Sequence, residues 1–387
     1  MRTQTRNPHI DVLRGVSIIA VMLLHFTLAF GIGNSPFAEL LGLRFARALI
    51  FNGNFGVTLF FVISGYLITS MSVLRWGALA RIDLPTFYTY RFARIIPALL
   101  VALIVIVTLG CLGVPYFSNT DDGHHLTASY FWIAVGSILT FWHNVLMQQQ
   151  GWFNYCLNIY WSLSVEEVFY LGLPAFCLLF RRTGLFVVAC VALIIYGPVY
   201  RSYHLGNGLF WECGYGACFD SIALGCLSAL LARRRAPGRL TATLLRALSA
   251  SGIVVTYLRG IDGHEVFGFT LISFCTAIYL LASHGEWDSN AWALRLTSPL
   301  RWLGRHSYEL YLFHIVILAL MRNVYARGEL QPLGWAFWFA FFVILSGMLA
   351  HLVAQYISEP ANLAIRTRYL NWFDRKALPA KATSLIG

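Results

Sequence analysis

The chain has 387 residues, of which 58% are hydrophobic, 16% aromatic and only 12% charged. A soluble globular protein carries about 25% charged residues, so this composition excludes a soluble fold and is typical of a polytopic membrane protein surrounded by lipid. The formal net charge of +11 does not indicate nucleic acid as a partner. The basic residues lie in short clusters between apolar runs, as they do in cytoplasmic loops.

Windows of about 20 apolar residues predict membrane-spanning helices. They lie at residues 11–32, 54–74, 95–114, 161–180, 184–200, 212–232, 239–258, 266–284, 306–324 and 335–357. The predicted fold class is therefore an all-α polytopic membrane protein with about ten transmembrane helices. A further apolar stretch at 130–147 is predicted to be a re-entrant or outer-leaflet segment. Backbone of that kind must be buried in protein or line a cavity, which we expect to open on the outer side.

The basic residues predict the orientation of these spans. With ten spans, most of the 28 Lys and Arg residues fall on one side, which the positive-inside rule identifies as the cytoplasm. Counting 130–147 as a full span would move several of the basic clusters outside. We therefore expect both termini in the cytoplasm, with tails at about 1–10 and 358–387. The N-terminal run lacks a clear cleavage site, so it is interpreted as a retained span.

The first span contains Arg14 and His25, eleven positions apart in DVLRGVSIIAVMLLHF. Helix geometry brings His25 to within roughly 20° of the face of Arg14 and about 16 Å further along. Arg14 would then lie at the cytoplasmic mouth and His25 near mid-depth, where an ionisable residue by default indicates function. A neutral imidazole could act there as a general base. The alternatives are a His hydrogen-bonded between helices and an Arg14 paired with Asp11.

Two further charged pairs lie in the third and fourth spans. Arg91 and Arg94, in FYTYRFARIIP, either hold phosphates of a cytoplasmic cofactor or anchor the helix at the membrane surface. Glu166 and Glu167, in YWSLSVEEVFY, are placed in the outer half of the fourth span. At least one of them should face a cavity, an Arg or a His, and the alternative is a structural ion pair.

Later spans add Asp220, in FDSIALG, and His314, in RHSYELYLFH. His314 lies about 13 Å into the membrane from Arg305, a depth similar to that of His25. Tyr311 neighbours His314 on the helix, although aromatic residues here are more often interfacial or packed. Because no Cys-x-x-C pattern occurs, no metal site is predicted.

Seven segments of the chain together resemble the acyltransferase-3 family of integral-membrane acyltransferases. They are DVLRGVSIIAVMLLH, GVTLFFVISGYLIT, FYTYRFARIIPALL, YWSLSVEEVFYLGLP, FDSIALGCLSAL, LGRHSYELYLFH and YISEP. The resemblance covers nearly the whole chain. It implies a ten-helix domain in the bacterial cytoplasmic membrane that takes an acyl group, usually acetyl, from cytoplasmic acyl-coenzyme A. The group passes to a hydroxyl of a carbohydrate or lipid-linked glycan at or beyond the outer face.

The resemblance also implies roles for individual residues. Arg14 and His25 match the family's essential pair, Arg91 and Arg94 its cytoplasmic arginines, Glu166 and Glu167 its acidic pair, and Tyr311 and His314 its late Tyr-x-x-His. The catalytic residues would be Arg14, His25, Glu166 and Glu167. Arg14, Arg91 and Arg94 would bind acyl-CoA, while Trp161, Asp220, Tyr311 and His314 would form the substrate and oxyanion pocket. Some members carry an outer esterase-like domain. This chain is expected to lack one and to form a single membrane domain over residues 1–387.

The expected reaction uses acetyl-CoA as donor and no metal. The pantetheine arm would run along the first helix and place the thioester near His25, which removes the proton of a sugar hydroxyl. Direct transfer and an acyl-His intermediate both stay open. The rival hypothesis is a transporter or flippase for a glycan or small molecule, which would also need polar residues at the midplane. A membrane scaffold without activity is disfavoured by the number of buried ionisable residues.

Overall fold

The computed structural model describes residues 7–33, 35–285 and 291–383. Within these ranges the chain consists of helices and their connections, with no strand. The predicted all-α class is therefore confirmed. The outermost parts of the predicted tails, residues 1–6 and 384–387, lie outside the described residues.

Each of the ten predicted spans coincides with a helix. These are α1 (Pro8–Phe30), α4 (Phe55–Trp76), α5 (Leu84–Cys111), α8 (Trp161–Phe180), α9 (Thr183–Tyr203), α11 (Tyr215–Arg234), α12 (Arg239–Arg259), α13 (Gly268–Ala282), α16 (Ser307–Met321) and α17 (Pro332–Val353). In the described part of the chain, eight helices are long and apolar enough to cross a membrane. The other two, α13 and α16, have 15 residues each. Each is about 22 Å long, shorter than a bilayer core of about 30 Å.

Shorter helices connect and cover the long ones. They are α2 (Pro36–Leu41), α3 (Leu43–Ile50), α6 (Ala128–Leu139), α7 (His143–Gln150), α10 (Gly208–Cys213), α14 (Ala291–Leu296) and α15 (Ser298–Arg305), with short 3₁₀ turns at Leu79–Arg81, Asp121–Gly123 and Asn158–Tyr160. The predicted re-entrant stretch at 130–147 is thus divided between α6 and α7. The chain turns between them at Phe141, whose φ is +62°. Neither helix is long enough to cross a bilayer.

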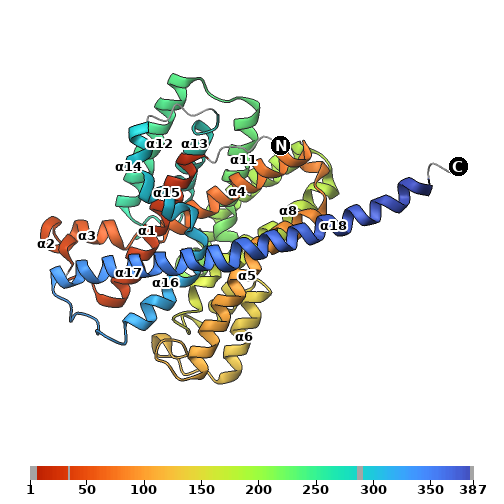
Figure 1. The fold of residues 1–387 in the computed structure, drawn as a ribbon. Coiled ribbons are helices and arrows are strands. Elements are labelled where there is room, and N and C mark those ends of the chain that lie inside the picture. Colours follow the sequence, from red (N-terminus) through yellow and green to blue (C-terminus); the bar gives the residue numbers. More distant parts are fainter. Residues whose placement is uncertain (1–6, 34, 286–290, 384–387) are drawn as a thin grey trace.

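Close helix contacts at glycines fix the centre of the bundle. A Cβ atom on Gly15 of α1 would collide with the Leu300 carbonyl of α15, and one on Gly304 would collide with the Asp11 carbonyl. Small residues let two backbones approach in this way, as is common between membrane helices. The contact places the start of α16, which follows α15, beside the Arg14 region of α1. Helix α4 packs against both α1 and α11 (Figure 1).

The outer helices have the surface expected of lipid-facing spans. In α12 only Ser249 and Thr256 are buried, while Leu240, Leu248 and Val255 are exposed. An apolar exposed face is favourable in lipid and unfavourable in water. The described helices therefore form a bundle with a buried centre and an apolar perimeter.

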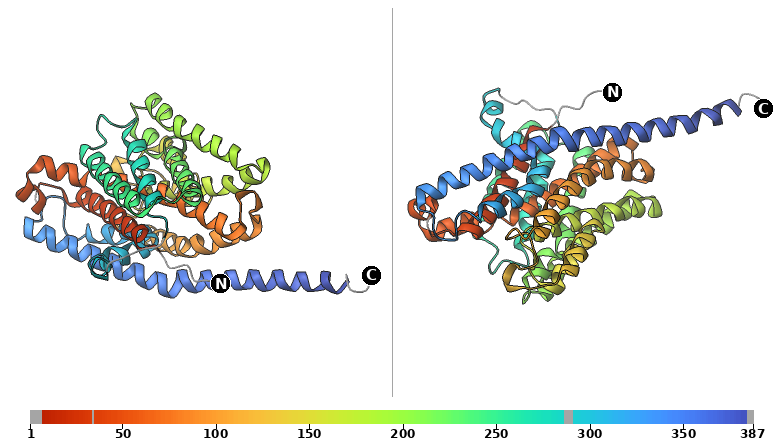
Figure 2. Two further views of the ribbon diagram at one scale, coloured as in Figure 1. Left: turned by 90° about the horizontal axis from the view of Figure 1, so that it is seen from above. Right: turned by 60° about the horizontal axis from the view of Figure 1, so that its bottom comes forward.

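The last span continues far beyond its predicted end. Helix α17 passes through a π-helical turn at Ala354–Ser358 into α18 (Glu359–Thr383). The predicted cytoplasmic tail is thus largely helical. Helix α18 packs against α5 near its start and then projects beyond the bundle, as both views in Figure 2 show.

Candidate functional site

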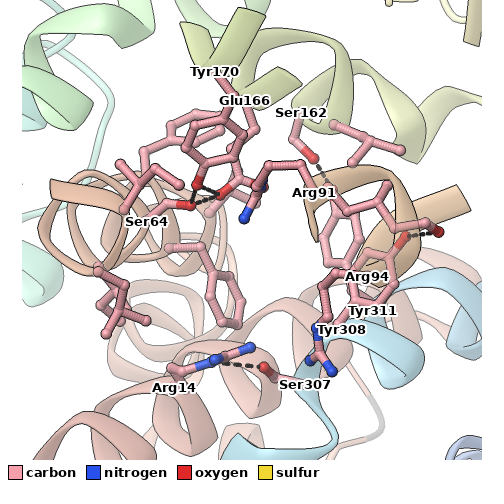
Figure 3. A pocket seen from close by; sticks show the side chains of 18 of the residues that line it. Arg14, Ser64, Arg91, Arg94, Ser162, Glu166, Tyr170, Ser307, Tyr308 and Tyr311 are labelled. Atoms are coloured by element: carbon pink, nitrogen blue, oxygen red, sulfur yellow. Dashed lines mark hydrogen bonds between the residues drawn. The ribbon is translucent and has the colours of Figure 1, made fainter. Parts of the chain in front are cut away.

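A pocket of about 260 Å³ lies where α1, α4, α5, α8 and α16 meet (Figure 3). Its polar lining residues are Arg14, Ser64, Arg91, Arg94, Ser162, Glu166, Tyr170, Ser307, Tyr308 and Tyr311. The remaining walls are aliphatic and aromatic side chains. Three arginines predicted to act at the cytoplasmic mouth therefore share one cavity with one of the two predicted carboxylates.

The start of α1 and its close packing against α15 determine where Arg14 lies. The Asn7 side chain accepts hydrogen bonds from the first turn of α1 and Pro8 follows it, which starts the helix just before Arg14. Because α15 packs tightly on α1, the first residue of α16, Ser307, reaches the Arg14 side chain. Arg14 Nε donates to Ser307 Oγ at 3.0 Å. Arg14 is thus oriented along the pocket wall, as Figure 3 shows.

Arg91 and Arg94 enter the pocket from α5 in different electrostatic situations. The Arg91 guanidinium forms an ion pair with Glu167 at 3.1 Å and lies 3.7 Å from the centre of the Tyr170 ring. Arg94 stacks at 5.8 Å over the Tyr308 ring and, within the described residues, has no ion pair. The charge of Arg91 is therefore compensated inside the protein, while that of Arg94 faces the pocket.

The two adjacent glutamates point to different partners. Glu167 is 6% exposed and pairs with Arg91, as the structural alternative in the sequence predicted. Glu166 lines the pocket and accepts hydrogen bonds from Ser64 and Tyr170. Both were placed in the outer half of their span, apart from the arginines. The structure instead brings them to the arginine pocket, because hydropathy gives the ends of a helix but not its tilt or offset against its neighbours.

The predicted pair of histidines meets deeper in the bundle. His25 Nδ1 lies 3.0 Å from His314 Nε2. His314 Nδ1 lies 3.0 Å from the Leu310 carbonyl oxygen and 2.9 Å from that of Tyr311. A carbonyl can only accept, so His314 Nδ1 carries the proton and its neutral Nε2 is an acceptor. His25 Nδ1–H then donates to it, which leaves the lone pair of His25 on Nε2.

Tyr311 connects this histidine pair to the arginine pocket. Its ring lies 5.9 Å from that of His314, and it also lines the pocket. Its hydroxyl donates to the Ile159 carbonyl at 2.8 Å and lies 2.7 Å from Ser162 Oγ. The histidine pair and the arginine pocket are therefore adjacent parts of one candidate site.

The family can now be stated from comparison with known proteins. A family described as an acyltransferase domain matches residues 7–353. This chain belongs to that acyltransferase family. Helix α18 lies beyond the matched residues, while every site residue described so far lies within them.

Several curated relatives of this acyltransferase chain are similar over most of its length. It is 25% identical over 377 residues to O-acetyltransferase OatA of Staphylococcus aureus, a match that covers 91% of this chain and 57% of that protein. It is 26% identical to peptidoglycan O-acetyltransferase OatA of Listeria monocytogenes (95% and 57%). It is 28% identical to the putative peptidoglycan O-acetyltransferase YrhL of Bacillus subtilis (95% and 56%). The chain thus spans a little over half the length of these relatives. No solved structure matches it.

Two predicted pocket residues of the acyltransferase chain lie elsewhere. Asp220 is fully buried in an ion pair with Arg201 at 2.7 Å and also accepts from Thr270 at 2.7 Å, so we leave it out of the site. Trp161 packs edge-on against Phe61, with ring centres 6.0 Å apart, and does not line the pocket. The sequence placed both residues on helices but could not give the neighbouring helix that each one contacts.

Other pocket residues were not singled out in the sequence. Ser64, Tyr170 and Ser307 line the cavity. Ser and Tyr within apolar helices usually serve packing, so composition alone does not separate these residues from structural ones. The signal available was their position within the segments that carry the family resemblance. Among the described residues, no group of His, Cys, Asp and Glu could hold a metal ion.

Proposed function

We propose that this protein is an O-acyltransferase, specifically an O-acetyltransferase, that uses cytoplasmic acetyl-CoA and acylates a carbohydrate hydroxyl at the outer side of the membrane. Membership of the acyltransferase family supports the reaction class. Two of the relatives named above are peptidoglycan O-acetyltransferases by name, which favours a cell-wall or lipid-linked glycan as acceptor. The proposal places the chain in the bacterial cytoplasmic membrane with both termini in the cytoplasm.

The observation that carries this proposal is the hydrogen-bonded histidine pair. The contact to His314 holds the His25 ring and fixes its proton on Nδ1, so that Nε2 is the basic atom. A base held in one tautomer by a second group is the arrangement that activates hydroxyl nucleophiles in acyl transfer. We assign His25 as the catalytic base and His314 as the residue that positions it.

The proposed transfer step balances as follows. His25 Nε2 takes the proton of the acceptor hydroxyl while the hydroxyl oxygen bonds to the thioester carbonyl carbon. The tetrahedral intermediate then breaks its C–S bond, and the CoA thiolate receives the proton from His25. In the alternative route, the same Nε2 atom first bonds to the thioester carbonyl carbon and the C–S bond breaks, which releases the CoA thiolate and leaves an acyl-imidazolium. The acceptor hydroxyl then bonds to the acyl carbon, its proton passes to the thiolate, and the C–N bond breaks to regenerate His25. Both routes need the same free Nε2 atom.

A residue other than His314 must donate a hydrogen bond to the oxyanion of the tetrahedral intermediate. Both nitrogens of His314 are already used, one as donor to backbone carbonyls and one as acceptor from His25. It has no N–H left for an oxyanion. Tyr311 lies beside His314 and lines the pocket, and its single O–H donates to the Ile159 carbonyl. We propose Tyr311 as the oxyanion donor, which requires its O–H to turn from that carbonyl towards the reacting carbon.

The pyrophosphate of the donor fits the arginine pocket. Arg14, Arg91 and Arg94 line it together, and guanidinium groups bind phosphate oxygens through two hydrogen bonds at once. Arg14 and His25 lie about 16 Å apart along α1, a separation that suits a donor with phosphates at one end and a thioester at the other. Glu167 holds Arg91 in place, and Glu166 holds the hydroxyls of Ser64 and Tyr170.

The test uses the purified full chain in lipid nanodiscs with acetyl-CoA and a soluble peptidoglycan fragment. We expect acetyl transfer to the glycan, detected by mass spectrometry, and a loss of about 10²- to 10⁴-fold in kcat for His25→Ala. A thermal melt of the variant checks that it is folded. Full transfer by folded His25→Ala would contradict the proposal. Glycan uptake into liposomes without acetyl-CoA turnover would instead support a transporter.

A further inference from the structure

A second arginine cluster lies near the start of α5, outside the pocket described above. Two arginines lie close to the ring of Tyr90 of α5. The Arg75 guanidinium, from the last turn of α4, lies 4.1 Å from the centre of the Tyr90 ring and donates to the Tyr90 hydroxyl at 2.9 Å. The Arg366 guanidinium, from α18, lies 4.3 Å from the same ring centre. We call Arg75, Tyr90 and Arg366 the arginine clamp.

The charges of the clamp are not compensated within the described part of the chain, where no carboxylate forms an ion pair with Arg75 or Arg366. The Arg366 guanidinium is also repelled by both Arg75 and Arg94. Its Nε atom is buried and makes no hydrogen bond. Like charges held together around one aromatic ring, with a donor left unused, favour the binding of an anion with several acceptor oxygens.

The position of the clamp relates it to the donor end of the pocket. Tyr90 precedes Arg94 by four residues on α5, so it lies on the same face, about 6 Å closer to the helix start. Arg94 lines the pocket. The clamp therefore extends the row of cationic groups from the pocket towards the cytoplasmic end of α5.

We propose that the clamp binds the 3′-phosphate of the acyl-CoA nucleotide. This inference rests on the proposed function and adds a residue from outside the family match, since Arg366 lies beyond residue 353. The thioester end is assigned to His25 and the pyrophosphate to the arginine pocket. The 3′-phosphate is the remaining anionic group of the donor and lies farthest from the thioester. Helix α18 would thus complete the donor site by packing on α5.

The experiment compares two donors and three variants in nanodiscs of zwitterionic lipid. The donors are acetyl-CoA and acetyl-3′-dephospho-CoA. The variants are Arg366→Gln, Arg366→Lys and the matched control Arg368→Gln, which changes an exposed arginine two residues along the same helix. For the wild type, removal of the 3′-phosphate is expected to raise KM about tenfold with little change in kcat. This comparison needs no mutation and is independent of folding.

The variants should show that Arg366 binds the 3′-phosphate. Arg366→Gln is expected to raise KM for acetyl-CoA about tenfold and to leave KM for the dephospho donor unchanged, because the lost partner is absent there. Arg366→Lys should recover part of the loss, and Arg368→Gln should match the wild type. Equal losses of Arg366→Gln with both donors, or equal KM values of the wild type for both donors, would overturn the inference.

An anionic lipid head group presents the same phosphate chemistry, so a parallel series includes phosphatidylglycerol. A loss for Arg366→Gln that appears only with this lipid would overturn the assignment to the donor. Measuring the direct binding of CoA and dephospho-CoA to the same variants tests the clamp separately from the proposed acetyl-transfer reaction. Absence of turnover with phosphate-dependent CoA binding would contradict the proposed reaction alone. Turnover without such dependence would contradict the clamp alone.

Discussion

Two groups of ionisable side chains lie inside this helical bundle, and they differ in how their charges are satisfied. In the α9–α11–α13 region, Arg201 and Asp220 are fully buried and paired at 2.7 Å, and Arg201 also donates to the Val266 carbonyl. In the arginine pocket, Arg91 forms an ion pair, while Arg94 forms none among the described residues and faces the cavity. The sequence singles out Asp220 and the pocket arginines alike, because an ionisable residue within an apolar helix is costly in lipid.

The difference indicates which group is structural. The Arg201–Asp220 pair uses its hydrogen-bonding groups on other protein atoms, so these groups are not available to a ligand. It ties three helices together, and Gly197 leaves the space that Asp220 occupies. A charge that faces a cavity without an ion pair among the described residues, as that of Arg94 does, is available to an anionic ligand. We therefore expect mutations in the first group to change stability and mutations in the second to change donor binding.

The largest effect is expected from breaking the closed pair. Asp220→Ala should lower the free energy of unfolding by about 3–5 kcal/mol, because it leaves the Arg201 guanidinium buried without a counter-charge. Thermal melts in detergent measure the loss. The double variant Arg201→Met with Asp220→Val should recover much of it, since an apolar pair of nearly the same total volume carries no charge to bury.

The distinction between structural and ligand-binding charges fails if the Arg201–Asp220 pair takes part in the reaction. Acetyl transfer per folded molecule should stay near the wild-type value in the double variant. A folded double variant that has lost transfer would show that Asp220 belongs to the site after all.

The next largest effect is expected at the positioning histidine. His314→Leu removes the acceptor of His25 Nδ1–H, so that the ring can turn or exchange tautomers, and kcat should fall about 100-fold with little change in KM for acetyl-CoA. His314→Gln keeps an acceptor oxygen and should retain more activity than His314→Leu. Equal kcat values for the two folded variants would contradict the positioning role, as would a loss confined to KM.

The sequence predicted the helices well and their mutual placement less well. All ten predicted spans coincide with helices, because a long apolar run in lipid has few alternatives to a helix. Depth along a helix was also predictable. His25 and His314 were expected at similar depths from the helix rise, and the structure places them 3.0 Å apart.

The remaining features depend on contacts between helices, which no single segment encodes. The meeting of Glu167 and Arg91 requires the tilt and offset of α8 against α5. The partner of Asp220 is Arg201, which the sequence did not single out. The clamp on Tyr90 combines residues from α4, α5 and α18, and α18 was expected only as a tail. Hydropathy contains none of this information.

The smallest effect is expected from mutating the two neighbouring arginines of the pocket. It tests, within one cavity, whether a paired arginine serves stability and an unpaired one serves donor binding. Arg94→Gln should raise KM for acetyl-CoA about tenfold, as expected for one lost charged hydrogen bond, and should leave the melting temperature unchanged because no internal ion pair is broken. Arg91→Gln should also lower the melting temperature, because it leaves the buried Glu167 carboxylate without its partner. The double variant Arg91→Gln with Glu167→Gln should restore the melting temperature but not KM. If Arg94→Gln and Arg91→Gln lower the melting temperature equally, pairing within the protein does not distinguish structural from ligand-binding charges here.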